Sequence, residues 1–268
     1  MEPIGYIASF GIGLILGLTG GGGSLLSLPI LVYLFSVGVI EATSYSLFIV
    51  GITSLIGAAH RYSSAMISLY LVGIFGVPSI IAVFITRVWI IPTLPEEIFQ
   101  IGAFHFNQRQ LILSCYGILV IIASIFMITH RESRFFQKSF TNNHQPIRLI
   151  LFGILTGFIT GFIGLGGGFM IVPLLMLIAN APFKTAVGTT LLIIAAKSLV
   201  GFIGDLNIYV IDWFLILSVS AVSVLGILLG NKFSTQISVQ LLKTAFGWFI
   251  LIMGSSVLLF ELIIKGTS

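Results

Sequence analysis

Charged residues are scarce in this sequence. Of its 268 residues, 7% are Asp, Glu, Lys or Arg, whereas 57% are hydrophobic. A soluble domain contains about 25% charged residues, so this composition does not provide the surface of a soluble protein. The apolar runs are also long and unbroken, unlike the alternating segments of roughly ten residues in a transmembrane β-barrel. The composition therefore predicts an all-α, polytopic helical membrane protein.

Residues with catalytic or redox chemistry are scarce as well. The single cysteine, Cys115, excludes an intramolecular disulfide. The sequence contains no H-E-x-x-H motif, no cluster with metal-ligand spacing and no nucleophile elbow, and its acidic residues lie near the ends of apolar segments. An intramembrane hydrolase would need such groups together at depth. We therefore expect no catalytic residues, no metal, no cofactor and no nucleic-acid partner.

Glycine, by contrast, is abundant and forms a run that occurs twice. The copies read Gly17-Leu18-Thr19-Gly20-Gly21-Gly22-Gly23-Ser24, followed by Pro29, and Gly161-Phe162-Ile163-Gly164-Leu165-Gly166-Gly167-Gly168, followed by Pro173. Glycine is a poor residue for a helix interior, and a broken backbone at membrane depth is tolerated only inside protein or beside a wet cavity. Two such breaks at matching positions are typical of a transporter binding site, although close helix packing is the simpler alternative for one pair of glycines.

The two halves of the chain align without a gap at an offset of 144 residues, which places the glycine runs and their prolines over one another. We interpret this as an internal repeat, with a first repeat over 1–129, a linker over 130–147 and a second repeat over 148–268. The short segments beside the glycines are either thin spans or the arms of re-entrant hairpins. Both alternatives give each half an odd number of crossings, so the sequence predicts an inverted repeat.

The basic residues of the loops predict the orientation through the positive-inside rule. The linker is expected in the cytoplasm and both termini outside, in the cell membrane. The polar stretch 87–110 has no counterpart in the second half and is expected to form a short amphipathic or interfacial segment at the outer face, with a functional lid as the less favoured alternative. The linker side carries eight basic residues and the opposite side three: Arg61, Arg131, Arg134, Lys138, Arg148, Lys184, Lys232 and Lys243 against Arg87, Arg109 and Lys265.

The third apolar segment of each half carries hydroxyl groups. Seven residues separate Ser46 from Thr53 and Thr190 from Lys197, a spacing that places each pair on one helix face. These faces either line a polar path or hydrogen-bond to their own helix backbone. Helices that restart after the glycine runs would aim free N–H groups at the same depth, and such N-termini bind anions. The predicted binding residues are Gly20, Gly21, Gly22, Gly23, Ser24, Ser46, Thr53, Gly164, Gly166, Gly167, Gly168, Thr189, Thr190 and Lys197.

Lys197 is the basic residue that we expect deepest within a span. It lies about 12 residues, or roughly 18 Å, into its apolar segment, where an unpaired charge is costly. One alternative is that its side chain stretches to the surface near Asp205. The favoured alternative is that it faces a cavity and supplies the positive charge for an anion. His60 and Asp205, at the ends of matching segments, are expected to be interfacial anchors.

Both glycine runs with their prolines, and the stretch Ala186-Val187-Gly188-Thr189-Thr190-Leu191, resemble the TauE/SafE family, also called sulfite exporters or toluene-sulfonate uptake permeases. The resemblance covers nearly the whole chain. It implies a multi-pass plasma-membrane transporter, here expected to be an exporter, of small sulfur-containing anions such as sulfite or organosulfonates. Its partners would be the anion, the bilayer and H+ or Na+ as a coupling ion. The alternative from another class is a non-transporting membrane scaffold.

The two runs differ at two matching positions, with Thr19 against Ile163 and Ser24 against Gly168. Strict two-fold binding of the substrate is therefore not expected.

Overall fold

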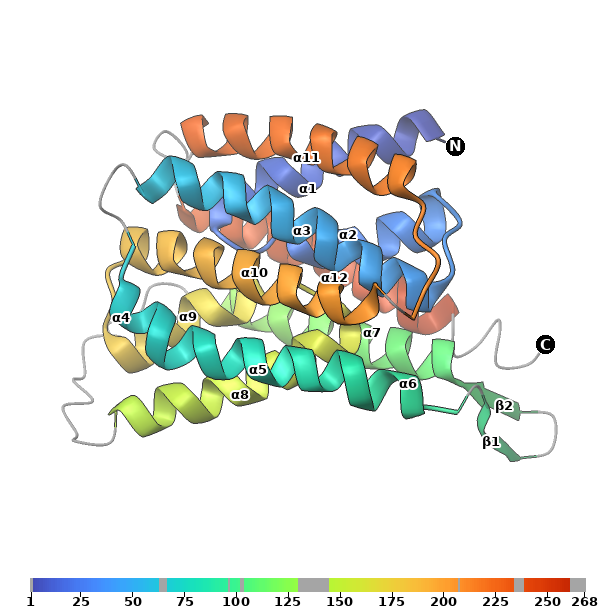
Figure 1. The fold of residues 1–268 in the computed structure, drawn as a ribbon. Helices are drawn as coiled ribbons and strands as arrows, with labels where there is room; N and C mark the ends of the chain where they lie inside the picture. The colour runs from blue at the N-terminus through green and yellow to red at the C-terminus, as the bar shows by residue number, and fades with distance from the viewer. Residues whose placement is uncertain are drawn as a thin grey trace.

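A computed structural model describes residues 2–62, 67–95, 97–101, 104–129, 145–206, 208–233 and 239–260. Most of its helices run along one common direction, which is horizontal in Figure 1. Within the described part of the chain, six helical segments are long and apolar enough to cross a membrane. The predicted class, an all-α polytopic membrane protein, is confirmed.

The two halves present matching series of helices. The first half contains α1 (Glu2–Thr19), α2 (Ser24–Pro29), η1 (Ile30–Leu34), α3 (Val39–Tyr62), α4 (Leu69–Leu71), η2 (Val72–Gly76), α5 (Val77–Ile85), η3 (Thr86–Ile90), α6 (Ile91–Thr93) and α7 (Gln108–Thr129), where η denotes a π-helical turn. The second contains α8 (Gln145–Ile163), α9 (Gly168–Ala179), α10 (Phe183–Asp205), α11 (Trp213–Phe233) and α12 (Val239–Leu259). The run from α4 to α6 is a single continuous helical segment that matches α11.

Each glycine run closes a hairpin. After the first run the chain turns back along α1, so that the ring of Phe35 packs edge-on against Tyr6 with ring centroids 5.3 Å apart. In Figure 1, α1 starts at the right-hand end and α2 returns toward it, whereas α8 starts at the left-hand end and α9 returns there. Of the two alternatives for these short segments, the structure therefore has hairpin arms rather than thin spans.

A hydrogen bond from outside the hairpin supports its second arm. Proline at position 29 has no N–H to donate to the carbonyl oxygen of Leu25, four residues earlier. The hydroxyl of Tyr116, in α7, donates to that oxygen at 2.6 Å instead. Tyr116 itself is fully buried, so this bond satisfies two interior polar groups at once.

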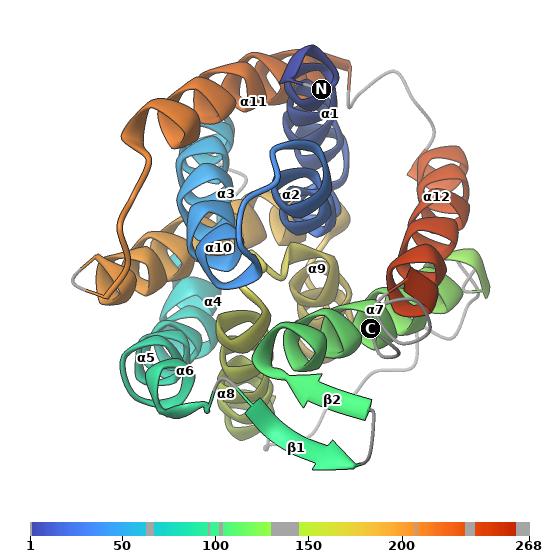
Figure 2. The same cartoon turned by 90° about the vertical axis from the view of Figure 1, so that its right-hand side faces the viewer.

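The two halves exchange their outer helices, in the sense that each of these helices packs most extensively against a helix of the other half. The most extensive contacts pair α1 with α11, α8 with α5, α3 with α10 and α7 with α12. Small residues allow this closeness: a Cβ at Gly13 would lie 2.7 Å from the carbonyl carbon of Ser223, and one at Gly157 would lie 2.9 Å from the Cα of Ser79. Such small-residue seams are how helices associate in membranes. Seen end-on in Figure 2, α2 and α9 lie in the middle of the molecule.

The insertion at 87–110 contains a short antiparallel hairpin, β1 (Glu97–Ile101) and β2 (Phe104–Asn107). The sequence predicted an interfacial segment here but no strands. The hairpin lies at the end of the bundle where α1 begins (Figure 1). Asn107 then caps α7, because its Oδ1 accepts from the N–H of Gln110 at 3.0 Å while Gln110 Oε1 accepts from the N–H of Asn107 at 3.1 Å.

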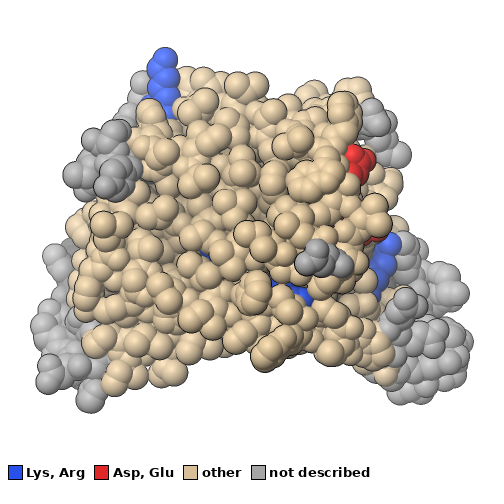
Figure 3. All heavy atoms as spheres, viewed as in Figure 1, with Lys and Arg blue, Asp and Glu red and all other residues tan. Residues whose placement is uncertain are grey.

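The outer faces of the helices are apolar. Ile7, Phe214 and Ile252 are each at least 66% exposed, and the described part of the face shown in Figure 3 carries few charged side chains. Such a surface suits lipid tails rather than water. The polar chemistry of the described residues is instead inside, where serine, threonine, lysine, arginine and aspartate side chains are buried.

Candidate functional site

The two glycine breaks touch at the centre of the molecule. A Cβ at Gly21 would lie 2.6 Å from the carbonyl oxygen of Gly168 and would clash with the Cα and carbonyl carbon of that residue. Gly20 and Gly164 each open their break with φ of +77°, a left-handed conformation that glycine adopts without strain. The structure therefore brings the two predicted glycine clusters together, and their residues are all buried.

The first break satisfies its own polar groups. The hydroxyl of Thr19 accepts from the N–H of Gly22 at 2.9 Å and donates to Ile15 O at 2.8 Å. Ser24 Oγ donates to Gly21 O at 2.8 Å. These internal bonds leave little unused hydrogen-bonding capacity at this break.

The second break has Ile163 and Gly168 where the first has Thr19 and Ser24, so it lacks both hydroxyls. At the first break, the Thr19 hydroxyl accepts a hydrogen bond from a backbone N–H group. Among the described residues, the N–H groups of Gly166 and Gly167 at the second break have no such partner. The helix α9 starts directly after Gly167, whose φ is +70°. The partially positive N-terminus of α9 therefore faces the protein interior.

Lys197 lies at this second break. Its side chain is 1% exposed, and its Nζ donates to Thr160 Oγ1, in α8, at 2.9 Å. A Cβ at Gly167 would lie 2.9 Å from the same Nζ, so the ammonium lies beside the start of α9. The side chain does not stretch to the surface. No described carboxylate forms an ion pair with it.

The predicted hydroxyl groups divide into two kinds. Besides Ser24, three have protein partners: Ser46 Oγ lies 2.5 Å from Ser27 Oγ, Thr53 Oγ1 donates to the carbonyl of its own helix at Ile49, and Thr189 Oγ1 accepts from Ser68 N. Thr190 Oγ1 is buried and has no hydrogen-bond partner among the described residues. Thr53 thus follows the alternative of bonding to its own helix, and Thr190 keeps its capacity for a ligand.

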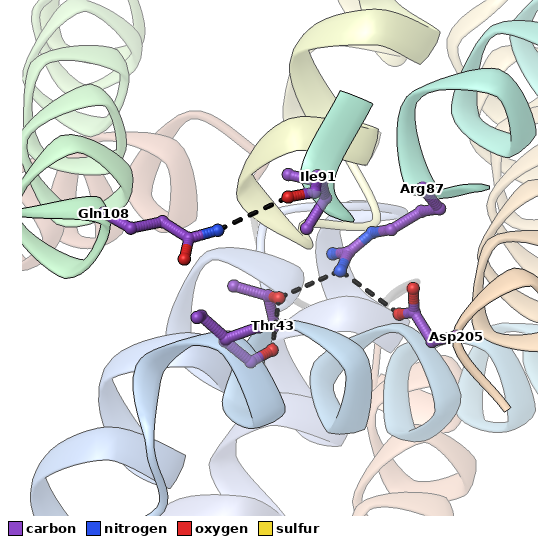
Figure 4. A network of polar contacts seen from close by, with 6 residues as sticks. Thr43, Arg87, Ile91, Gln108 and Asp205 are labelled. Atoms are coloured by element: carbon purple, nitrogen blue, oxygen red, sulfur yellow. Dashed lines mark hydrogen bonds and ion pairs between the residues drawn. The ribbon is translucent and has the colours of Figure 1, made fainter. Parts of the chain in front are cut away.

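Sequence reasoning missed a buried ion pair between Arg87 and Asp205. Both side chains have 0% exposure, and Arg87 Nη1 donates to Asp205 Oδ2 at 3.2 Å and to Thr43 Oγ1 at 2.9 Å (Figure 4). Arg87 was expected in a loop on the outer side and Asp205 as an interfacial anchor, but the structure instead buries both side chains within the bundle. The helical segment continues beyond Arg87 to Thr93, which keeps the arginine within the bundle.

A signal for this pair was present in the sequence. Arg87 and Asp205 carry opposite charges near the ends of two apolar segments, and the predicted topology ends both segments at the same face.

Tyr209 lies in the loop after α10, near Asp205. Burial raises the pKa of its phenol, and the negative charge of Asp205 raises it further. His60, the other expected anchor, lies in the last turn of α3 and its side chain is exposed.

The ion pair adjoins the second break rather than the first. A Cβ at Gly164 would lie 2.6 Å from the Cα of Thr43, the residue that binds Arg87. At the offset of 144 residues, Lys197 corresponds to Thr53 and Arg87 to Asn231. The second break is therefore flanked by two cations and one carboxylate, whereas these two matching positions beside the first break are uncharged.

A crevice elsewhere has different chemistry. It has a volume of about 560 Å³ and lies between α1, α2, η1 and α12, with Ile15, Pro29 and Met253 among its lining residues. Its walls are apolar, so it offers nothing to an anion. Among the described residues there is also no group of three His, Cys, Asp or Glu side chains that could hold a metal ion.

A profile of the sulfite exporter TauE/SafE family matches residues 6–257. The chain belongs to the TauE/SafE family. Similar proteins include a probable membrane transporter protein of Xylella fastidiosa strain 9a5c, 27% identical over 88% of this chain and 87% of the relative. The probable membrane transporter protein MJ0441 of Methanocaldococcus jannaschii is 28% identical over 76% and 72%, and YdhB of Bacillus subtilis 26% over 89% and 93%. No solved structure matches significantly.

Membership of this family accounts for both the buried polar centre and the apolar exterior. This TauE/SafE chain is a multi-pass membrane transporter, as the family and the names of its relatives indicate. The family assignment from the glycine runs is confirmed.

Proposed function

We propose that this protein is a secondary transporter that binds a small anion at the second glycine break. The single observation that supports this is Lys197, an ammonium buried beside the N-terminus of α9 with no described carboxylate paired to it. A lysine at the bilayer centre costs at least about 2.5 kcal/mol on insertion scales. An anion in contact with Nζ, with the free N–H groups of Gly166 and Gly167 and with Thr190 would offset that cost.

The family name suggests the substrate. We propose sulfite or an organosulfonate, moved outward, with H+ or Na+ as the coupling ion. An oxyanion of this kind matches a site that consists of hydrogen-bond donors. In the conformation described, the glycines of both breaks are buried, and transport would require the Gly21–Gly168 contact to open alternately toward each side.

The two repeats, 1–129 and 148–268, would provide these alternating movements. Residues 130–144 of the linker lie outside the described part of the chain, so the linker boundaries remain a prediction. The placement of the linker in the cytoplasm and of both termini outside the cell membrane is likewise part of this proposal. Because Arg87 is buried in the bundle, it no longer counts as an outer loop charge, which strengthens the charge bias.

The decisive experiment compares anion binding and transport in three variants. Lys197→Met should abolish sulfite binding in isothermal titration, Lys197→Arg should retain part of it, and Thr53→Val should behave as wild type. The Thr53 variant is a matched control, because it occupies the corresponding position in the first half and bonds to its own helix. Unchanged affinity in Lys197→Met would remove this residue from the site.

Proteoliposomes test transport itself. Labelled sulfite, an alkylsulfonate, sulfate and acetate should be offered under proton and sodium gradients in both directions. We expect at least one sulfur oxyanion to move, with a rate that depends on Lys197. Binding without movement under any gradient would favour the scaffold alternative. If the protein neither binds nor moves any of these anions, the proposed function is refuted.

A further inference from the structure

The buried guanidinium of Arg87 has an unused edge. Its Nη1 holds both Asp205 and Thr43. Its Nε and Nη2 have no hydrogen-bond partner among the described residues, although the side chain is fully buried. Buried donors of a charged group are costly when they remain unpaired, so a pair that served stability alone would be poorly built.

The unused edge has a specific chemistry. The Nε and Nη2 hydrogens of arginine point in parallel and match two oxygens attached to one central atom, as in a sulfonate, sulfite or carboxylate. The bonds from Nη1 to Asp205 and Thr43 fix the orientation of the guanidinium. In Figure 4 its second terminal nitrogen is turned away from Asp205, toward the side where Gln108 and Ile91 lie.

The position of Arg87 connects this edge to Lys197. Lys197, Gly201 and Asp205 are spaced four residues apart in α10 and therefore share one helix face. A Cβ at Gly201 would lie 3.9 Å from Arg87 Cγ, and one at Gly204 would lie 3.4 Å from Arg87 Cβ. The arginine stem thus lies along the glycines of α10, and the eight residues from Lys197 to Asp205 span about 12 Å.

From this geometry we propose that Arg87 is a second, weaker binding station for the same oxyanion, which it holds through its Nε–Nη2 edge. The inference rests on the proposed function, since the Arg87 station would be a second binding site along the path of the transported anion. Asp205 neutralises Arg87 and keeps the affinity of this station low, so that the anion does not remain there. The bidentate edge would select anions with two oxygens on one atom over a monatomic anion such as chloride.

Two substitutions should act in opposite directions. Asp205→Asn removes the competing carboxylate, so methanesulfonate should bind at least tenfold more tightly and raise the melting temperature more than it does in wild type. Arg87→Lys keeps a positive charge but lacks the forked edge, so methanesulfonate transport should slow at least tenfold. Chloride should stabilise neither variant beyond wild type. Arg109→Lys, at the start of α7, is the matched control for an arginine-to-lysine change.

A purely structural ion pair gives a different pattern. Both variants would then lose thermal stability, and neither would gain affinity for methanesulfonate; this pattern, or transport by Arg87→Lys at the wild-type rate, would overturn the proposal. The added Lys197→Met substitution separates the two sites. If Asp205→Asn still gains affinity in the Lys197→Met background, the Arg87 station stands by itself. If Lys197→Met alone leaves the affinity for methanesulfonate unchanged, the proposed Lys197 site is refuted, and the Arg87 experiment can still be interpreted.

Discussion

The contact between the two glycine breaks predicts that Gly21→Ala lowers stability sharply. The new methyl carbon would lie 2.6 Å from the carbonyl oxygen of Gly168 and clash with the adjacent backbone carbons. Normal contacts of this type are at about 3.5–4.0 Å, so the two breaks must separate by roughly 1 Å. Side-chain rotation cannot relieve the clash, because the opposing atoms belong to the backbone.

Overpacking of this kind costs about 1–3 kcal/mol, and each kcal/mol shifts the melting temperature of a chain of this size by about 2–4 °C. We therefore expect Gly21→Ala to melt roughly 2–12 °C below wild type in thermal unfolding of the purified protein in detergent.

The chain offers two matched controls for this measurement. A Cβ at Gly11, in α1, or at Gly73, in η2, would have no atom within 4 Å. Alanine at either position should leave the melting temperature unchanged or raise it slightly, since alanine is the better helix former. If Gly21→Ala melts at the same temperature as Gly11→Ala, the direct backbone contact between the breaks is not real.

Three further predictions concern the backbone, the core and the topology. Gly164→Ala should destabilise by at least about 1–2 kcal/mol, the cost of a left-handed conformation for a residue with a Cβ, and unfolding in detergent measures it; wild-type stability would contradict the positive φ. Tyr116→Phe leaves the carbonyl of Leu25 without its donor and should cost about 1–3 kcal/mol, seen as a lower melting temperature; no change would show that another group satisfies this oxygen. In a cysteine-free background, an impermeant thiol reagent applied to intact cells should label a cysteine at Val210 but not one at Lys184; the reverse pattern would invert the proposed orientation.

The sequence was sufficient for features that depend on local composition. The long apolar runs predicted the class, the doubled glycine run predicted two breaks, and the depth of Lys197 in its segment predicted a buried charge. These inferences need only helix length and the cost of charge in an apolar medium. They do not require knowledge of which helices become neighbours.

The remaining features depend on tertiary packing. Arg87 and Asp205 are 118 residues apart, and only the packing of α10 against the segment from α4 to α6 brings them together. The hydroxyls of Thr53 and Thr190 both lie in the third apolar segment of their half, yet Thr53 bonds to its own helix and Thr190 has no partner among the residues that the structure describes. Side-chain rotamers and neighbouring helices decide such differences, and the local sequence does not specify them.

The exchange of outer helices has a consequence for synthesis of the protein. The hydroxyl of Ser223, in α11, donates to the carbonyl oxygen of Ser9, in α1, across 214 residues of sequence. At about 5–20 residues per second, a ribosome needs roughly 10–40 s to make the partner of α1 after α1 itself has emerged. During that interval the glycine-lined face of α1 has no helix packed against it. The first hairpin must therefore remain at the insertion machinery or in the lipid with this face exposed. A chaperone or a truncated copy of the chain could bind to the exposed face there.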